Sequence, residues 1–267
     1  MITSSANPRI KQIRKLRERK ERQQSGLFYA EGLRIVIEAV SENASIKALV
    51  FSPELLTSEM GIKIISDQSQ RGIEILEVSR DVFKTLALKD DPQGIGAVIE
   101  QTWLPIDKID LRPGEFWVAL DAVADPGNLG TILRTNDSVG GKGVILLGNT
   151  TDPYDPTSMR ASMGAIFSQK LVRADFEQFA AWKQVSGIAV IGASGAARCD
   201  YHHTQYPSEF VLLMGSERQG LLENALALCD QVVSIPMVGR SDSLNLAVAN
   251  AILLYEIYNQ HRDQKQE

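Results

Sequence analysis

Two patterns of apolar residues alternate along most of this chain: short continuous apolar runs, and longer stretches with apolar residues three or four positions apart. The runs predict buried strands, and the spaced stretches predict amphipathic helices. In the N-terminal part, the predicted strands are residues 27–30, 46–51, 73–78 and 94–100, and the predicted helices are residues 31–40 and 80–87. This order predicts a small α/β domain that closes near Glu100.

The alternation restarts after residues 101–115, which contain two prolines, lack an apolar period and therefore predict a linker. Beyond it, the predicted strands are residues 116–121, 143–148, 187–194, 209–216 and 230–237, and the predicted helices are residues 128–139 and 175–185 and a helix start at 155–162. Continuous apolar strands between helices predict an α/β fold with a mostly parallel sheet covered on both faces. We therefore predict two domains, residues 1–105 and 106–267.

Composition and cysteine usage exclude several classes of protein. Hydrophobic residues make up 44% and charged residues 23% of the chain, and no apolar stretch is as long as a membrane helix. The stretch "MITSSANPRIKQIRKLRERKERQQ" has no apolar core of the signal-peptide kind, so we expect a cytoplasmic protein away from membranes. Cys199 and Cys229 have no metal-ligand spacing, and the histidines form no H-E-x-x-H pattern. We expect no metal site.

The net charge of −5 is unevenly distributed. Residues 1–26 contain eight Lys and Arg and two Glu, a net charge of +6, so the rest of the chain carries −11. Residues 7–24 predict a polar helix with a narrow apolar stripe at Ile10, Ile13 and Leu16. Such a basic stretch either forms solvated surface or contacts phosphates, where counterion release favours binding, and charge alone favours neither interpretation.

Polar residues concentrate in four loops that follow predicted strands, which is where parallel sheets bind ligands. One of these loops, "YDPTSMRASMGA", carries Arg160, Ser162 and Gly164. Arg134 lies in an otherwise apolar helix, a placement typical of an anion site or of an exposed surface. "GSERQGL" begins at Gly215, and "SDSLN" precedes the apolar helix from Leu246 with more polar residues than a helix start requires. The motifs of nicotinamide enzymes, P-loop ATPases and α/β-hydrolases are absent from the sequence. These observations indicate a nucleotide-like ligand held by backbone groups.

Three blocks, "NLGTILRTNDSVG", "LLMGSERQGL" and "SIPMVGRSDSLNLAVANAILLYE", follow in this order at strand ends. Together they resemble the three motifs of the SpoU (TrmH) family of RNA ribose methyltransferases. The N-terminal part, through "NPRIKQIRKL", Arg19, Arg22, Phe28, Glu31 and Gly32, resembles the substrate-binding domain often fused to these enzymes. The resemblance covers most of the chain.

The resemblance implies an α/β SPOUT domain whose C-terminal part is threaded into a trefoil knot, an exception to the usual rule against knots. The knot would comprise the loops after Met214 and Ile235 and the helix from Ser243. The cofactor would be S-adenosylmethionine, bent in the knot and held largely by backbone groups. The positions that match or neighbour the family's cofactor contacts are Ala193, Ser194, Gly215, Ile235 and Leu244.

By the same resemblance, Arg134 activates the ribose 2′-hydroxyl that attacks the methyl group. Because free arginine stays protonated, we expect Arg134 to stabilise negative charge, and its role as a base stays an open hypothesis. Asn128 and Glu217 are expected to orient Arg134 and the motif loops, while Ser243 and Asn245 are expected to fix the ribose and the loop geometry.

The expected partners are RNA and a second copy of the chain, paired through the C-terminal domains. Ribosomal RNA is favoured over transfer RNA because of the fused N-terminal domain. A non-catalytic RNA-binding or ribosome-assembly module is the remaining alternative. Arg218 stands where many relatives have a small residue, and its role is unassigned. The expected phosphate contacts are Arg9, Lys11, Arg14, Lys15 and Arg19.

Overall fold

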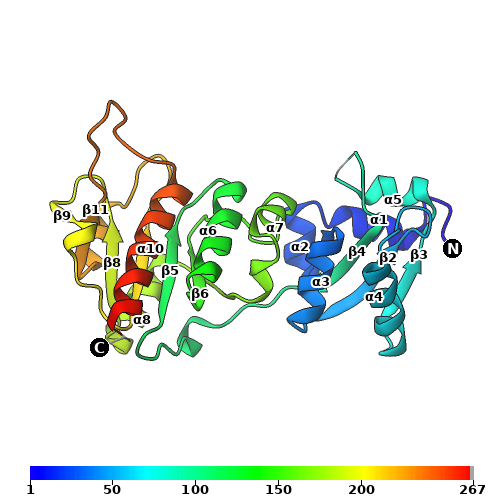
Figure 1. Cartoon of the computed structure of the whole chain (residues 1–267), viewed down its shortest axis with the longest axis horizontal. Helices are drawn as coiled ribbons and strands as arrows, with labels where there is room; N and C mark the ends of the chain where they lie inside the picture. Colours follow the sequence, from blue (N-terminus) through cyan, green and yellow to red (C-terminus); the bar gives the residue numbers. More distant parts are fainter. Residues whose placement is uncertain (89, 265–267) are drawn as a thin grey trace. The chain divides into compact units, whose positions relative to one another are not determined.

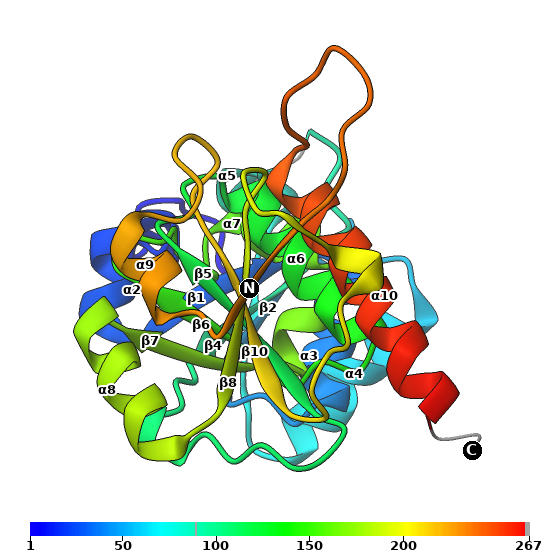
Figure 2. The same cartoon turned by 90° about the vertical axis from the view of Figure 1, so that its left-hand side faces the viewer.

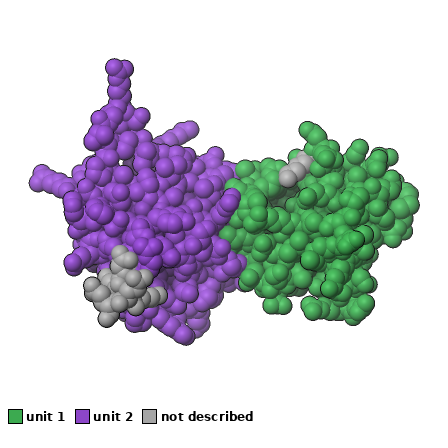
Figure 3. All heavy atoms as spheres, viewed as in Figure 1, with its two compact units in different colours: residues 1–101, 154–167 green, residues 102–153, 168–267 purple. Residues whose placement is uncertain are grey.

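The computed structural model describes residues 1–88 and 90–264 and divides into two compact units. Unit 1 comprises Met1–Gln101 together with Tyr154–Phe167, and unit 2 comprises the remaining residues (Figure 3). The first break lies near the linker expected from the sequence. The segment 154–167 packs with unit 1, although the sequence placed it in the second domain.

Unit 1 is a mixed sheet with helices on both faces. Its strands follow the order β1-β4-β2-β3, in which β4 runs antiparallel to β1 and β2, and β3 runs parallel to β2. Figure 1 labels β4, β2 and β3. The elements are α1 (Pro8–Lys15), α2 (Arg19–Ser25), β1 (Leu27–Glu31), α3 (Leu33–Ser41), β2 (Ile46–Phe51), α4 (Glu59–Gln70), β3 (Glu74–Glu77), α5 (Arg80–Leu86), β4 (Ile95–Glu100) and, from the later segment, α7 (Pro156–Ser162) and the short turn η2 (Ala165–Phe167).

The basic N-terminal stretch forms two helices rather than the single helix expected over residues 7–24. Asn7 caps α1 by accepting a hydrogen bond from the Arg9 N–H, and α2 ends at Gly26 in the left-handed conformation. The stripe of Ile10, Ile13 and Leu16 is buried against α5 and the sheet. The stretch is thus part of the unit 1 core on one side and solvent-exposed on the other.

Helix α4 has no counterpart among the predicted elements. It contains a glycine at position 61, and its apolar residues Met60 and Ile62 are exposed while Ile64 and Ile65 are buried. The apolar period is therefore blurred, because residues on both sides of the helix are apolar. Ser58 provides the N-cap, accepting a hydrogen bond from the Gly61 N–H.

Unit 2 is built on a sheet that has seven strands within the described residues, in the order β7-β6-β5-β10-β8-β11-β9, with every described pairing parallel. This confirms the α/β class and the parallel sheet predicted from the continuous apolar strands. The elements are η1 (Ile106–Lys108), β5 (Phe116–Asp121), α6 (Pro126–Ser138), β6 (Gly143–Leu147), β7 (Lys170–Ala174), α8 (Phe176–Ser186), β8 (Ala189–Ala193), β9 (Cys199–Asp200), η3 (Tyr201–His203), β10 (Phe210–Met214), α9 (Glu223–Leu228), β11 (Gln231–Ser234) and α10 (Leu246–Gln264).

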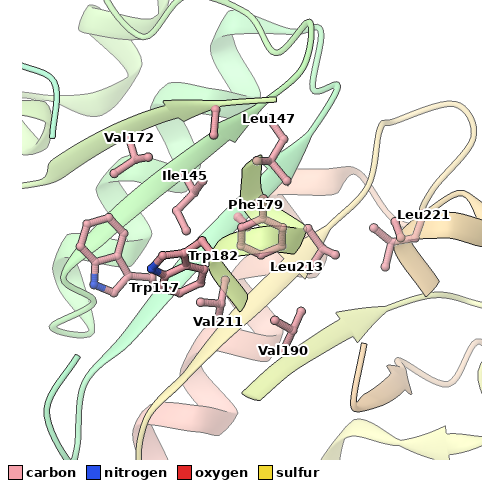
Figure 4. Packing of buried hydrophobic residues seen from close by; sticks show 13 residues of the cluster. Trp117, Ile145, Leu147, Val172, Phe179, Trp182, Val190, Val211, Leu213 and Leu221 are labelled. Atoms are coloured by element: carbon pink, nitrogen blue, oxygen red, sulfur yellow. The ribbon is translucent and has the colours of Figure 1, made fainter. Parts of the chain in front are cut away.

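Both faces of this sheet are covered. On one face, Trp117, Ile145 and Leu213 from the strands pack against Phe179 and Trp182 of α8 (Figure 4). On the other face lie α6 and α10, which pack side by side, and the rings of Phe116 and Phe210 contact His261 of α10. The expected linker contributes to the first face, because Leu104, Ile106, Ile109 and Leu111 pack there.

Candidate active site

The three sequence blocks converge at the carboxyl ends of β5, β10 and β11. In the parallel register, Leu120 of β5 lies beside Met214 of β10, so the loops that follow these strands leave the sheet at the same edge. The segment between β11 and α10 projects beyond that edge as the loop drawn in orange above α10 in Figure 2. The strand order therefore brings polar residues that are far apart in the sequence together at this edge of the sheet.

Helix α6 begins with a strong start signal. Asp125 caps it, its carboxylate accepting a hydrogen bond from the Asn128 N–H at 2.7 Å, and Pro126 occupies the first turn. Leu129, Ile132 and Leu133 are buried. Their burial leaves Arg134 on the exposed side of the helix.

The turn between β10 and α9 is closed tightly on itself. Gly220 adopts a left-handed conformation with φ +65°, and its N–H donates to the Ser216 carbonyl at 3.0 Å. A side-chain carbon at Gly215 would lie 2.1 Å from the Gly220 carbonyl carbon. Only glycine fits at position 215, so the backbone can fold back immediately after the strand.

Glu217 projects from this turn and connects it to the start of α6. Its carboxylate accepts hydrogen bonds from the Ala124 N–H and the Asp125 N–H, both at 3.1 Å, and from the Asn128 side-chain amide at 3.0 Å. Partial burial by itself would raise the pKa of this carboxyl. The hydrogen bonds, from Asn128 and the backbone, outweigh burial and hold the Glu217 pKa below its ordinary value.

Asn245 adds the third block to the same network. Its amide nitrogen donates to the Asn128 side-chain oxygen at 3.0 Å. Its own oxygen accepts from the Ala247 N–H at 2.9 Å and the Val248 N–H at 3.3 Å, which caps α10. One continuous hydrogen-bond chain, Glu217–Asn128–Asn245, thus links the starts of α6 and α10 to the turn after β10. We call it the motif relay.

Beside the motif relay lies a cavity of about 380 Å³. Its walls come from the end of β8, the turn after β10, β11 with its following loop, and α10. All five predicted cofactor positions lie in its lining: Ala193, Ser194, Gly215, Ile235 and Leu244. Among the described residues it is also lined by Met237, Asp242 and Leu253, which the sequence analysis did not single out.

The predicted catalytic residues divide into two groups. Glu217 and Ser243 line the cavity, while Asn128 and Asn245 stand next to it in the motif relay. Arg134 is not among the cavity residues, and its guanidinium has no hydrogen bond or ion pair with any described residue. Within the described residues, no hydrogen bond or ion pair therefore joins Asn128 or Glu217 to the Arg134 side chain, although the sequence-based expectation was that they orient it.

The five predicted RNA contacts lie on α1 and α2 or beside them. Lys11, Lys15 and Arg19 are exposed, and Arg14 is half-buried. Arg9 is exposed as well, but it forms an ion pair with Glu74 at the neighbouring strand β3.

Two other arginines of this stretch are structural. Arg17 donates to the carbonyls of Thr85 and Ala87 at the end of α5. Arg22 is 1% exposed, donates to the Leu16 and Arg17 carbonyls and faces Asp155 at 3.5 Å. Buried or carbonyl-bound arginines cannot be told from exposed ones by charge alone, so the sequence did not separate them.

Among the described residues, no three His, Cys, Asp or Glu side chains gather as a metal site. No described helix is both long and apolar enough to span a membrane. Cys199 and Cys229 are free and half-buried, and burial raises the pKa of the Cys229 thiol to about 11.

Family sequence models match both parts of the chain. The model described as the SpoU rRNA Methylase family matches residues 115–255, more than half of the chain. The model described as the MRM3-like substrate binding domain matches residues 7–97. The chain belongs to the SpoU rRNA methylase family. This confirms the resemblance inferred from the three blocks and from the N-terminal part.

Individual members of the SpoU family extend the match over the full length. The 23S rRNA (guanosine(2553)-2′-O)-methyltransferase RlmP of Bacillus subtilis is 31% identical, over 96% of this chain and 98% of its own. The 23S rRNA (uridine(2479)-2′-O)-methyltransferase of Streptomyces viridochromogenes is 30% identical, over 96% of this chain and 91% of its own. The AdoMet-bound rRNA methyltransferase of Sinorhizobium meliloti superposes with a TM-score of 0.89 at 39% identity, covering 97% of each chain.

Proposed function

We propose that this chain transfers a methyl group from S-adenosylmethionine to a ribose 2′-hydroxyl of ribosomal RNA. The single observation that carries the proposal is the cavity at the carboxyl edge of the parallel sheet, which is lined by the second and third blocks and joined to the first block through Asn128. Full-length relatives that act on 23S rRNA, and a relative structure described as AdoMet-bound, support the substrate and the donor.

The cavity residues fit this donor. Leu244, Ile235 and Leu253 offer apolar surface for an adenine, and the backbone around Gly215 offers hydrogen-bonding groups. The cavity volume of about 380 Å³ falls in the usual range for small-molecule sites, roughly 300–1,000 Å³. When bound, S-adenosylmethionine supplies an electrophilic methyl group on a sulfonium sulfur. We assign Ala193, Ser194, Gly215, Ile235 and Leu244 to its binding.

Arg134 carries the charge that the reaction needs. As the ribose hydroxyl loses its proton, negative charge develops on the oxygen, and a fixed cation lowers the energy of that charge. An exposed guanidinium without a described partner can turn toward an incoming ribose or phosphate. We assign Arg134 this electrostatic role, and its action as the base stays a hypothesis because a guanidinium keeps its protons.

The motif relay holds the reacting groups in position. Glu217 fixes the loop before α6, and Asn128 passes this constraint to Asn245 at the start of α10. Ser243, in the cavity wall, is assigned to the ribose. Holding the reactants in a fixed arrangement lowers the activation barrier of methyl transfer. The motif relay therefore contributes to the reaction rate as well as to stability.

We further propose a homodimer whose N-terminal units bind ribosomal RNA. Unit 1 would bind folded RNA through the exposed cations of α1 and α2. Val248, Tyr255 and Tyr258 are 48%, 49% and 38% exposed on α10, and this apolar surface supports pairing of two copies through unit 2. We also propose the trefoil knot around the loops after Met214 and Ile235, and a cytoplasmic location, which is supported by the bacterial rRNA methyltransferases among the relatives.

The test separates chemistry from cofactor binding. We expect Arg134→Ala to lower the rate of methyl transfer by about 10²-fold or more, because it removes the cation that stabilises the developing charge. Its affinity for S-adenosylmethionine should stay unchanged, since Arg134 does not line the cavity. Transfer of radiolabelled methyl groups is measured on 23S rRNA, intact large subunits and transfer RNA, and affinity is measured by calorimetry.

Ser138→Ala is the matched control, because Ser138 is exposed on the same helix and lies one turn further along. It should keep full activity. Full activity of Arg134→Ala would remove the catalytic assignment. A wild-type protein that binds RNA but neither binds nor uses S-adenosylmethionine would instead be a non-catalytic module.

A further inference from the structure

Arg218 occupies a position in the cavity wall that neither the motif relay nor the proposed chemistry uses. It lies in the turn between β10 and α9 and lines the cavity together with Gly215 and Ser216. The side chain is exposed, and its guanidinium has no hydrogen bond or ion pair with any residue that the structure describes.

The turn that carries Arg218 is fixed on both sides. Ser216 and Gly220 form an antiparallel bridge, and the Gln219 N–H donates to the Ser216 hydroxyl at 3.2 Å. Glu217 is anchored to the loop before α6. The backbone of Arg218 therefore has a defined place at the cavity, and only the side chain is free to reorient.

The charges around the cavity leave Arg218 available to a ligand. Its neighbour Glu217 already accepts hydrogen bonds from two backbone N–H groups and from Asn128, which occupy its carboxylate. Among the described residues that line the cavity, Arg218 is the one basic side chain, and Glu217 and Asp242 are the acidic ones. An anionic group that enters the cavity thus meets a single cationic partner.

We propose that Arg218 binds the α-carboxylate of the methionine part of S-adenosylmethionine. The inference rests on the cofactor cavity proposed above. In this cofactor the sulfonium and the ammonium are positive, the adenosine is neutral, and the carboxylate is the one anionic group. A guanidinium donates two parallel N–H bonds to a carboxylate, an arrangement that a lysine does not reproduce.

The experiment compares two cofactor analogues that differ in this group. S-adenosylhomocysteine keeps the methionine-type carboxylate, whereas 5′-methylthioadenosine lacks the amino-acid part. By calorimetry, Arg218→Ala should bind S-adenosylhomocysteine about tenfold more weakly, a typical loss for hydrogen bonds between charged groups. Its affinity for 5′-methylthioadenosine should not change. Arg218→Lys, which keeps the charge without the fork, should recover part of the loss.

Arg112→Ala is the matched control. It removes the same charge from an exposed site before β5, at the opposite end of that strand from the cavity, and should bind both analogues like the wild type. Equal weakening of both analogues by Arg218→Ala would overturn the proposal, because Arg218 would then only shape the cavity.

An unchanged affinity for S-adenosylhomocysteine together with a raised KM for RNA would also overturn it and would assign Arg218 to an RNA phosphate. If the wild type binds neither analogue, the cofactor cavity itself fails, and with it this inference. Failure of the cavity is distinguishable from failure of the Arg218 assignment, because the wild type binds the analogues in the second case and does not bind them in the first.

Discussion

Glu217 joins parts of the chain that lie about ninety residues apart, through hydrogen bonds to the Ala124 and Asp125 N–H groups and to Asn128. These donors favour the ionised carboxylate and lower its pKa in spite of partial burial. A group whose pKa is lower in the folded state stabilises the fold above its unfolded pKa. Ionised Glu217 therefore contributes stability at neutral pH.

We expect Glu217→Gln to lower the melting temperature at pH 7, because one amide oxygen cannot replace both carboxylate oxygens. The difference from the wild type should stay constant above about pH 4.5, the ordinary pKa of the group. It should narrow as the pH falls below that value, since the wild-type carboxylate becomes protonated and loses its advantage. Thermal unfolding followed by circular dichroism between pH 7 and pH 3 measures this.

Glu42→Gln controls for the loss of one charge. Glu42 is exposed and its side chain has no hydrogen-bond partner among the described residues, so the variant should melt close to the wild type at pH 7. A Glu217→Gln difference that keeps its full size down to pH 3 would show that the carboxylate charge is not what the fold uses.

The basic residues of the N-terminal stretch differ in role according to what their side chains contact. Arg17 and Arg22 stand in the same basic stretch as Lys11 and Lys15, yet both are bound to backbone carbonyls. Arginine suits such sites because its planar group donates several hydrogen bonds at once. Of the basic residues here, those without such contacts are the better candidates for phosphate.

At the scale of elements, the start of α10 serves both stability and the site. Asn245→Ala removes the helix cap and the bond to Asn128, and we expect it to cost about 1 kcal/mol of stability and to slow methyl transfer. Asn245→Asp keeps an oxygen for the cap but loses the amide donor. It should unfold in urea like the wild type and still lose activity as Asn245→Ala does.

Asn245→Ala and Asn245→Asp together separate the two roles of Asn245, as the cap of α10 and as a member of the motif relay. Unfolding in urea reports the cap, and the rate of methyl transfer at saturating cofactor reports the motif relay. If Asn245→Asp is as active as the wild type, the bond between Asn245 and Asn128 has no part in the reaction. If Asn245→Asp is also as unstable as Asn245→Ala, the cap oxygen is not what stabilises α10.

Strands with continuous apolar runs were predicted well, as were helices α3, α5, α6 and α8, whereas α4 and β7 were not predicted. The strands β5, β6, β8 and β10 are buried on both faces, so their sequences are continuous apolar runs, broken only at the terminal Asp121 of β5. The edge strand β7 carries the exposed residues Lys170 and Arg173, which interrupt its apolar run, and it is missing from the prediction. An edge strand has one neighbour and one solvated side, which weakens the sequence signal.

At the scale of the whole molecule, the basic stretch cannot be removed without damage. Ile10, Ile13 and Leu16 belong to the unit 1 core, so deletion of residues 1–24 would expose that core. Loss of RNA binding after such a deletion would not distinguish a missing contact from an unfolded unit. A test of the RNA surface must change exposed charges alone.

We expect the triple variant Lys11→Ala, Lys15→Ala, Arg19→Ala to fold normally and to bind RNA more weakly. Each lost phosphate contact should reduce the slope of log K against log salt by roughly 0.7–0.9, so the slope should flatten by up to about 2–3. Affinity for the cofactor should not change, because no residue of this set lines the cavity. Filter binding at several salt concentrations measures the slope.

The matched control removes three other exposed cations of unit 1, Lys47, Lys63 and Arg71, which lie on β2, on α4 and at the end of α4. Its salt dependence should equal that of the wild type. Equal flattening in both triple variants would mean that unit 1 attracts RNA through its total charge and not through the face formed by α1 and α2.

Segment 154–167 packs with unit 1, although it follows the expected linker in the sequence. It lies inside the stretch that matches the SpoU rRNA methylase family, yet the Tyr154 ring lies tilted against Phe28, Asp155 faces Arg22, and Gly164 packs closely on Glu38. Apolar residues of the segment complete unit 1. A domain boundary drawn in the sequence alone, at residue 105, does not show that the second part supplies a piece of the first unit's packing.

The sequence by itself determined the family, the parallel sheet of unit 2 and the positions around the cavity, because these depend on local patterns: continuous apolar strands and short motifs at strand ends. Only the tertiary structure decided that Glu217, Asn128 and Asn245 form one hydrogen-bond chain while Arg134 stands apart. It also decided that Arg17 and Arg22 are structural. Hydrogen bonds between residues about ninety or more positions apart depend on strand order and on the register of packed elements, which no local pattern specifies.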